Sequence, residues 1–457
     1  MERPAAARSD VLLDIPYRWI LCWLLLPNLI VILMWPIVGV PMQAGIALSG
    51  ALAFVVSQLP WRPVRALGVA AIIVMVSTLY VSHLFAIPPL NIELITQSVS
   101  DIRPLQSPEY AIAGALLLAI MGTAIHLAPR VRPFSGWMQP LYAALAVMLF
   151  INLDGALAFD GRQLHRSLPS AGTPIDSAVR HAQLSPAAKP RHNVLIIMVE
   201  ALGMPSTPEE RAIFASDWNR PEWSRRYDVR QGTTRYFGST TNGELRELCD
   251  RWAHYSGFDF DHADCLPHRF QRAGYETTAM HSFGGQLFDR RNWYPKIGFE
   301  NLAFSDELWR EGAGRCPGVF PGACDADVPA IIGRKLAGAR KPQFIYWLTL
   351  NTHVPVVEDD ALGTNHCSVG PKEWRAEYPG LCRLFQLHHI LADRISALAM
   401  SPELPPTDIL IVGDHKPPLF DRASNGRFDP GHVPWVYLRA RDITPSSTPP
   451  ALAPPSR

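Results

Sequence analysis

Five long apolar segments in the first third of the chain are its strongest structural constraint. They cover roughly residues 17–40, 42–59, 64–87, 110–127 and 137–159. A helix needs about 20 mostly apolar residues to cross the hydrocarbon core of a bilayer, and each segment is close to that length. One such segment is compatible with a buried helix of a soluble protein, but five in succession favour the membrane. The sequence therefore predicts an α-helical membrane domain of five spans over residues 1–160.

Arginines in the short connections between these segments indicate the orientation. Arg62 and Arg65 lie between the second and third segments, and Arg130 and Arg132 lie between the fourth and fifth. Because short cytoplasmic loops are enriched in arginine and lysine, both connections are expected in the cytoplasm, together with the N-terminus. Five spans then place everything after the last segment on the outer face. We expect a bacterial inner-membrane protein whose C-terminal part lies in the periplasm.

The cysteines favour the same compartment. Cys22 lies in the first apolar segment, and the other six follow the last one. An even number of cysteines in close pairs is typical of disulfides formed in an oxidising environment. Buried free thiols or a zinc site are the alternatives, although no Cys-x-x-Cys pair is present. Neighbour pairing is one of several possible connectivities, and it would join Cys249 to Cys265, Cys316 to Cys324 and Cys367 to Cys382.

Composition and periodicity divide the rest of the chain. Residues 161–192 are rich in proline, serine and alanine and are predicted to form a linker. Residues 193–442 alternate strand and helix patterns, which predicts an α/β domain with strands at 343–350, 408–412 and 434–438 and a helix at 384–400. Residues 443–457 are expected to be a disordered tail. The net charge is +1 and no long basic run occurs, so nucleic acid is not an expected partner.

The α/β pattern opens with an apolar run, residues 194–199, that ends in the carboxylate of Glu200. Such a run is typical of a strand buried on both faces of a parallel sheet. Ligands of open α/β sheets bind at the carboxyl ends of the strands, which is where Glu200 would lie. A carboxylate at that place is suited to a cation. The structural alternative is that Glu200 caps the following helix or pairs with an arginine.

Two further motifs would lie near the same edge of the sheet. A second apolar strand ends in Asp414-His415, and a small polar turn, residues 238–244, contains Thr240 and Thr241 in front of a helical pattern. A turn at a helix N-terminus presents a hydroxyl and N–H groups suited to anionic oxygens. Carboxylate, imidazole and hydroxyl groups together are plausible ligands for zinc or manganese. Taken singly, the first motif is equally compatible with a loop and the second with a helix cap.

These motifs resemble the sulfatase-type branch of the alkaline phosphatase superfamily. The resemblance is carried by residues 199–203 (Val-Glu-Ala-Leu-Gly), 240–244 (Thr-Thr-Asn-Gly-Glu), 350–353 (Leu-Asn-Thr-His) and 413–418 (Gly-Asp-His-Lys-Pro-Pro). It covers about residues 190–440. Within that branch the chain resembles membrane-anchored phosphoethanolamine transferases and lipoteichoic acid synthase-like phosphoglycerol transferases, which also carry a five-span anchor. The resemblance implies an alkaline-phosphatase-like α/β fold with a largely parallel central sheet.

The resemblance also implies roles for individual residues. Thr240 would be the nucleophile, because the family pattern Thr-x-x-x-Glu places it four residues before Glu244. The ligands of the catalytic metal, zinc or alternatively manganese, would be Glu200, Thr240, Asp414 and His415. The phosphate or head group would be contacted by His281, Arg290, His353 and His432, and His353 would also assist proton transfer. Phe288 stands where a synthase would carry tryptophan beside that arginine.

The reaction implied is transfer of a phospho-head-group from a membrane phospholipid to a surface glycan or glycolipid. Metal ligation would lower the pKa of the Thr240 hydroxyl, and attack on the phospholipid would release diacylglycerol and leave a phosphothreonine. Phosphoethanolamine is the favoured head group, because disulfide-stapled domains are common among those transferases. Phosphoglycerol from phosphatidylglycerol is the alternative, because the Thr-x-x-x-Glu turn is closer to the synthases.

Two less favoured hypotheses belong to other classes. Cys265-Leu-Pro-His-Arg269 matches the Cys-x-Pro-x-Arg pattern that true sulfatases convert to formylglycine. True sulfatases, however, begin with paired aspartates where this chain has the single Glu200, and Cys265 comes well after the Thr240 turn. The other hypothesis is an inactive scaffold, against which all four expected metal-ligand positions are filled by competent residues.

Overall fold

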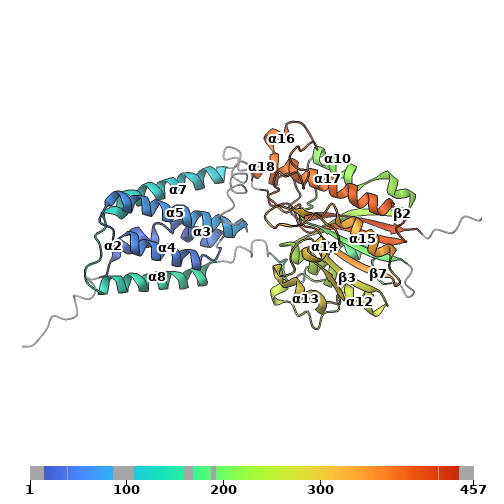
Figure 1. Ribbon diagram of the computed structural model, residues 1–457, viewed down its shortest axis with the longest axis horizontal. Coiled ribbons are helices and arrows are strands. Elements are labelled where there is room, and N and C mark those ends of the chain that lie inside the picture. The colour runs from blue at the N-terminus through green and yellow to red at the C-terminus, as the bar shows by residue number, and fades with distance from the viewer. Residues whose placement is uncertain are drawn as a thin grey trace, which may run out of the picture. The chain divides into compact units, whose positions relative to one another are not determined.

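The computed structural model describes residues 15–38, 40–85, 108–158, 168–186, 192–419 and 421–441. The chain divides into two units, which are described separately (Figure 1). The first comprises Met1–Ser167 with Phe420–Ala423, and the second comprises Leu168–Leu419 with Ser424–Arg457. The predicted tail, 443–457, lies outside the described residues.

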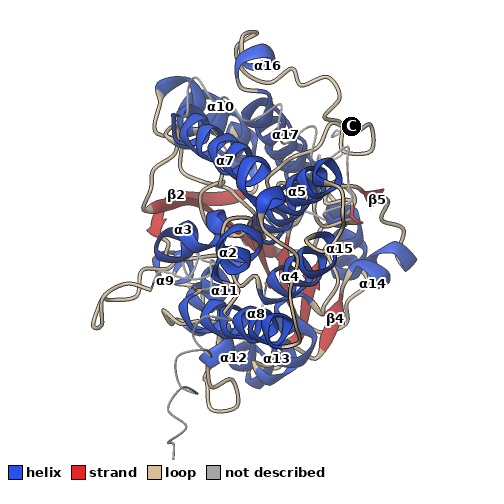
Figure 2. Cartoon of the chain, turned by 90° about the vertical axis from the view of Figure 1, so that its left-hand side faces the viewer, coloured by secondary structure: helices blue, strands red, loops and turns tan. Residues whose placement is uncertain are grey.

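Helices make up the first unit, and every labelled strand in Figure 2 belongs to the second. The helices follow the apolar segments of the sequence, because a backbone in hydrocarbon must satisfy its own hydrogen bonds. Their bounds are α2 Tyr17–Trp19, η1 Ile20–Leu25, α3 Leu29–Val38, α4 Gln43–Val56, α5 Arg62–Phe85, α7 Pro108–Leu127, η2 Ala128–Arg130 and α8 Met138–Leu157.

The described helices support fewer spans than the five predicted. Three are long and apolar enough to cross a membrane, at Arg62–His83, Ala111–Arg130 and Met138–Leu157. The first predicted span is broken into Tyr17–Leu25 and Leu29–Pro36, bent by 72°, and counts as a fourth if the pair forms one span. Helix α4 has only 14 residues, which is shorter than the about 20 that a span needs. The chain is thus a membrane protein with three to four span candidates.

A buried carboxylate explains where α4 begins. Asp154 of α8 is fully buried and accepts hydrogen bonds from the Trp35 indole (2.9 Å) and from the backbone N–H of Met42 (2.7 Å), the N-cap residue of α4. Helix N-termini have unpaired N–H groups, and a carboxylate there satisfies one of them. Asp154 therefore holds the break between α3 and α4.

The second unit is built on a seven-stranded sheet of order β2-β9-β8-β1-β7-β3-β4. Strands β8, β1, β7, β3 and β4 run parallel, whereas β9 pairs antiparallel with both β8 and β2. The predicted α/β domain with a largely parallel sheet is confirmed. Strand bounds are β1 Asn193–Val199, β2 Tyr227–Arg235, β3 Glu276–His281, β4 Asn301–Ala303, β7 Gln343–Leu348, β8 Thr407–Gly413 and β9 His432–Ala440.

Helices cover both faces of this sheet, which is why all seven residues of β1 are buried (Figure 1). One face packs on α10 Pro208–Trp218, α15 Val328–Ala337 and α17 Pro379–Met400. The other packs on α9 Ala178–Ala182, α11 Thr240–Cys249, α12 Leu266–Arg272 and α13 Arg290–Lys296. The remaining short elements are η4 Pro221–Arg225, η5 Tyr255–Gly257, η6 Leu287–Asp289, α14 Ser305–Arg310, β5 Arg315–Cys316, β6 Gly322–Ala323, α16 Trp374–Glu377 and α18 Arg422–Asn425.

Part of the predicted linker is folded into the second unit. The structure describes residues 168–186 of it, and these include α9, whose Ala178, Val179 and Ala182 are buried in the core beside β8. Asp176 ties the same segment to β2 by accepting the backbone N–H of Arg235 (3.0 Å). The proline and serine content favours a linker, and a five-residue helix gives too little periodicity to show in the sequence.

Three disulfides join neighbouring cysteines in the second unit. Cys249–Cys265 links the end of α11 to the start of α12. The other two are Cys316–Cys324 and Cys367–Cys382, and Cys22 is free. The spacing of the cysteines thus led to the same pairs that the structure joins.

Candidate metal centre and active site

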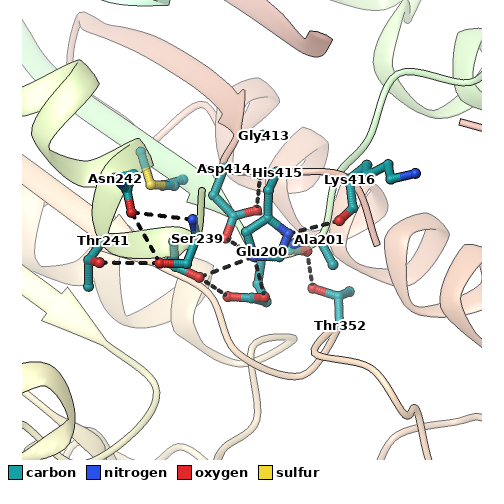
Figure 3. Close-up of polar contacts among 12 residues, drawn as sticks. Glu200, Ala201, Ser239, Thr241, Asn242, Thr352, Gly413, Asp414, His415 and Lys416 are labelled. Carbon is teal, nitrogen blue, oxygen red and sulfur yellow. Dashed lines mark hydrogen bonds and ion pairs between the residues drawn. The ribbon is translucent and has the colours of Figure 1, made fainter. Parts of the chain in front are cut away.

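The ends of β1 and β8 bring two carboxylates together. The strands are adjacent and parallel, with Val199 opposite Gly413, so Glu200 and Asp414 leave the sheet at the same edge. His415 follows directly, and its Nε2 lies 3.4 Å from Oε1 of Glu200 and 3.3 Å from Oδ2 of Asp414. Figure 3 shows the three side chains converging, and one ligand atom from each lies within 4.8 Å of the others.

Close backbone packing holds the two strand ends in this arrangement. A Cβ at Gly413 would lie 2.0 Å from the carbonyl oxygen of Leu202, so no larger residue fits there. Ala201 has φ +55, an uncommon conformation for a residue with a side chain, and its N–H donates to Oδ1 of Asp414 (2.8 Å). The turn after β1 is therefore fixed on the turn after β8.

Hydrogen bonding determines which nitrogen of His415 faces the carboxylates. Its Nδ1 lies 2.9 Å from the carbonyl oxygen of Lys416, which can only accept, so Nδ1 carries the proton and donates it there. Nε2 then points at Glu200 and Asp414. Burial opposes a charge on this ring, but the Asp414 and Glu200 carboxylates outweigh it and raise the pKa of His415 to about 10. Burial, with Glu200 beside it, raises the pKa of Asp414.

This donor set fits a divalent cation. Asp414 is 1% exposed, and its Oδ2 accepts no hydrogen bond from the described residues, although Nε2 of His415 lies 3.3 Å away. A buried carboxylate oxygen without a partner is costly unless a proton or cation compensates it. Two carboxylates and an imidazole nitrogen are ligands for zinc or manganese. The predicted metal ligands Glu200, Asp414 and His415 thus lie within reach of one ion.

Thr240 completes the cluster from a third element. It is the first residue of α11, and its Oγ1 lies 3.0 Å from Oε2 of Glu200 and 3.3 Å from Nε2 of His415. Ser239 precedes it as the N-cap, and the Asn242 side chain accepts the backbone N–H of Ser239 (3.3 Å). Helix α11 approaches closely because Gly243 faces Asp414, where a Cβ would lie 3.3 Å from Cα. Thr241 points instead toward Ser239 (3.3 Å).

Two of the predicted substrate histidines lie on neighbouring strand ends. His353 follows β7; burial lowers its pKa, and the nearby Glu200 carboxylate partly offsets that effect. His281 ends β3, and its Nδ1 lies 3.1 Å from the carbonyl of Leu348, to which it donates. Burial, with Arg290 nearby, lowers the pKa of His281 to about 3, so the ring is neutral. Its Nε2 is buried without a partner among the described residues and is available as an acceptor.

The other two predicted substrate residues are engaged elsewhere. Arg290 is 1% exposed, and its Nε (3.0 Å) and Nη2 (2.8 Å) both donate to Oε2 of Glu244. The described contacts thus make it the counter-ion of a buried glutamate. His432 begins β9 and pairs with Asp429 (3.1 Å), with 43% of its side chain exposed. The Thr-x-x-x-Glu spacing corresponds to about one turn of α11, which begins at Thr240 and carries Glu244 four residues later.

The structure adds residues around Glu200 that the sequence did not single out. The hydroxyl of Thr349 accepts the N–H of Glu200 (2.9 Å), and that of Thr352 donates to its carbonyl oxygen (2.6 Å). His388 of α17 also reaches the backbone of Glu200, and burial lowers its pKa to about 4. The periodicity of the predicted helix could have indicated that His388 is buried, because it lies on the same face as Leu384 and Leu391.

Comparison with known proteins identifies the family. The profile of the sulfatase family matches residues 192–439, more than half of the chain, so the chain belongs to the sulfatase family of the alkaline phosphatase superfamily. No curated protein sequence matches the chain significantly.

Solved structures show distant similarity. The lipoteichoic acid synthase LtaP from Listeria monocytogenes is 13% identical with a TM-score of 0.43, over 61% of this chain and 70% of that one. The lipooligosaccharide phosphoethanolamine transferase A (EptA) from Neisseria meningitidis is 13% identical with a TM-score of 0.43, over 95% and 89%. The phosphoglycerol transferase GacH from Streptococcus pyogenes, solved with sn-glycerol-1-phosphate, is 17% identical with a TM-score of 0.38, over 54% and 68%.

Proposed function

We propose that this protein is a metal-dependent transferase that moves a phospho-head-group from a membrane phospholipid to a surface glycan or glycolipid through Thr240. The observation that carries the proposal is the convergence of the Thr240 hydroxyl on Glu200, Asp414 and His415, at the edge where β1 and β8 end. The membrane unit supports a lipid donor, since three to four of its helical segments are span candidates.

Glu200, Asp414, His415 and Thr240 would hold zinc, or alternatively manganese. When bound, such an ion lowers the pKa of a coordinated hydroxyl and neutralises charge on phosphoryl oxygens. Thr240 Oγ1 would attack the phosphorus of the phospholipid, forming a threonine phosphodiester as the phosphorus–oxygen bond to diacylglycerol breaks. Diacylglycerol would leave with a proton. An acceptor hydroxyl would then attack the same phosphorus, transfer its own proton and restore Thr240.

The side chains around the cluster support this chemistry. The N-terminus of α11 presents backbone N–H groups beside Thr240, where phosphoryl oxygens would lie. His353, close to Glu200, is the proposed proton carrier for the leaving or entering hydroxyl. The neutral His281 offers an acceptor nitrogen suited to a hydroxyl or ammonium group of the substrate.

Phosphoethanolamine from phosphatidylethanolamine is the favoured donor group, and phosphoglycerol from phosphatidylglycerol is the alternative. Placement of the second unit in the periplasm is part of the proposal, as is the topology of five spans. Three disulfides in that unit support an oxidising compartment.

The two other hypotheses, a sulfatase and an inactive scaffold, have less support. A sulfatase would need Cys265 free for conversion to formylglycine, but Cys265 is fully buried and bonded to Cys249. An inactive scaffold would not need a hydroxyl, two carboxylates and an imidazole in contact at a strand edge.

Mass spectrometry of total glycans and glycolipids tests the proposal. Cells with the wild-type protein are expected to carry a head-group-modified glycan that is absent from cells with Thr240→Ala. Exposed Thr233→Ala, on β2, is the matched control and is expected to leave the modification in place. Unchanged modification in the Thr240→Ala strain would refute Thr240 as the nucleophile.

A further inference from the structure

A buried arginine holds the backbone that carries Asp414 and His415. Arg246 of α11 is fully buried, and its guanidinium donates through Nη2 to the carbonyl oxygen of Gly413 (2.8 Å) and through Nη1 to that of Asp414 (3.3 Å). Nη1 also donates to the carbonyl oxygen of Arg235 on β2 (3.2 Å). One rigid, planar group thus joins the helix of Thr240 to the turn after β8.

The next residue links this group to α9. Nε of Arg246 donates to Oε1 of Glu247 (2.6 Å), and Glu247 is 0% exposed. The same carboxylate accepts the N–H groups of Ala178 (3.1 Å) and Val179 (2.9 Å), the first two residues of α9. Helix α9 therefore connects through one carboxylate and one guanidinium to the backbone of a candidate metal ligand.

We propose that Arg246 is a positioning residue for the metal centre, and that Glu247 and α9 are parts of the same support. The proposal rests on the proposed function, because it concerns the placement of Asp414 and His415 relative to Thr240. Helix α11 packs so closely on this turn that a Cβ at Gly243 would lie 3.3 Å from Cα of Asp414, so a shift of the turn would alter the distances between the ligands. Helix α9 then helps to position the metal ligands and does not act only as part of a tether.

Positioning can be separated from ordinary stabilisation. A buried ion pair is weak evidence for stability, because desolvation offsets much of the attraction and an apolar replacement is often tolerated. What an apolar or single-point donor cannot reproduce is the simultaneous contact with three carbonyl oxygens and one carboxylate. Groups that orient metal ligands from outside the coordination shell are typically worth about 10–100-fold in metal affinity.

Zinc affinity of the full-length protein in detergent, measured by competition with a chromogenic chelator, tests the proposal. Arg246→Lys keeps the charge but loses the planar fork, and its affinity is expected to fall by roughly 10–100-fold. Arg251→Lys, exposed just after the same helix, is the control and should bind as the wild type does. The melting temperatures of the metal-free wild type and of both variants are recorded in parallel. Wild-type zinc affinity in Arg246→Lys, even with a lower melting temperature, would make the residue merely structural and overturn the proposal.

A second variant decides the outcome if Arg246→Lys does not fold. Ala178→Pro removes one N–H donor to Glu247 at the first position of α9, where proline is tolerated. Ser177, at φ −134 and ψ 148, already has the extended conformation that precedes proline. A smaller loss of zinc affinity in a folded protein supports the proposal, and unchanged affinity overturns the role of α9. A wild-type protein that binds neither zinc nor manganese would overturn the proposed function and this inference together.

Discussion

Replacing Arg290 separates a structural from a substrate-binding role for this residue. Its guanidinium and the Glu244 carboxylate are 1% and 0% exposed, and the carboxylate has two further partners, the hydroxyls of Tyr294 and Tyr346. Arg290→Met would leave Glu244 buried with only the two tyrosine donors. Removing one partner of a buried pair costs about 3–5 kcal/mol of unfolding free energy.

A loss of this size in unfolding free energy is measurable as a lower melting temperature. For a unit of this size about 2–4 °C is lost per kcal/mol, so Arg290→Met is expected to melt roughly 6–20 °C lower. The double variant Arg290→Met with Glu244→Gln removes both charges and keeps an acceptor for the tyrosines, so most of the loss should be recovered. Tryptophan fluorescence of the full-length protein during heating measures both. An Arg290→Met protein that melts with the wild type but transfers no head group would refute the structural assignment and return Arg290 to the substrate.

Three further predictions concern other parts of the second unit. The backbone N–H of Arg235 and the His181 side chain outweigh burial and lower the pKa of Asp176 below its ordinary 3.8. Its stabilisation is thus fully present above pH 3.8 and is lost as the pH falls through the lowered pKa. Asp176→Asn should therefore melt below the wild type at pH 7, and the gap in melting temperature should narrow as the pH falls below 3.8; a gap that stays constant over that range would contradict the assignment. Chelation with EDTA is expected to abolish transfer and lower the melting temperature, and zinc or manganese should restore both; activity that survives exhaustive chelation would exclude a metal mechanism. Gly243→Ala places a Cβ 3.3 Å from Asp414 and is expected to weaken zinc binding, whereas Gly257→Ala, with open space around it, should not; equal affinities would show that the helix can shift freely.

The metal cluster was predictable because its signals are local. An apolar run that ends in a carboxylate, at Glu200 and again before Asp414, indicates both the strand and the edge where its ligand lies. The predicted strands at 343–350, 408–412 and 434–438 correspond to β7, β8 and β9 within a few residues. Strands β2, β3 and β4 and the antiparallel direction of β9 are not predicted, because short strands with mixed polarity give a weak pattern and strand direction leaves no trace in a short apolar run.

The remaining site contacts depend on long-range pairing that spacing does not encode. Arg290 was expected at the substrate, but its partner Glu244 lies 46 residues earlier and is reached only in the folded sheet. Arg246 looked like an ordinary helix arginine, since nothing local indicates that Gly413 would lie beside it. Helix α9 lies in a segment whose composition favours a linker, and a count of apolar residues does not reveal the break at Asn28 or the start of α4 at Gln43.

The mass of the peptide that contains Thr240 tests the central claim most directly. Full-length protein supplied with zinc and phosphatidylethanolamine or phosphatidylglycerol, without an acceptor, is acid-quenched, digested and analysed by tandem mass spectrometry. A phosphoethanolamine adduct on Thr240 is expected with the first lipid, lost on chelation and absent from Thr240→Ala, and a phosphoglycerol adduct with the second would identify the alternative donor. No adduct with either lipid in a zinc-loaded protein, or an adduct on another residue, would contradict the assignment of Thr240 as the metal-activated nucleophile.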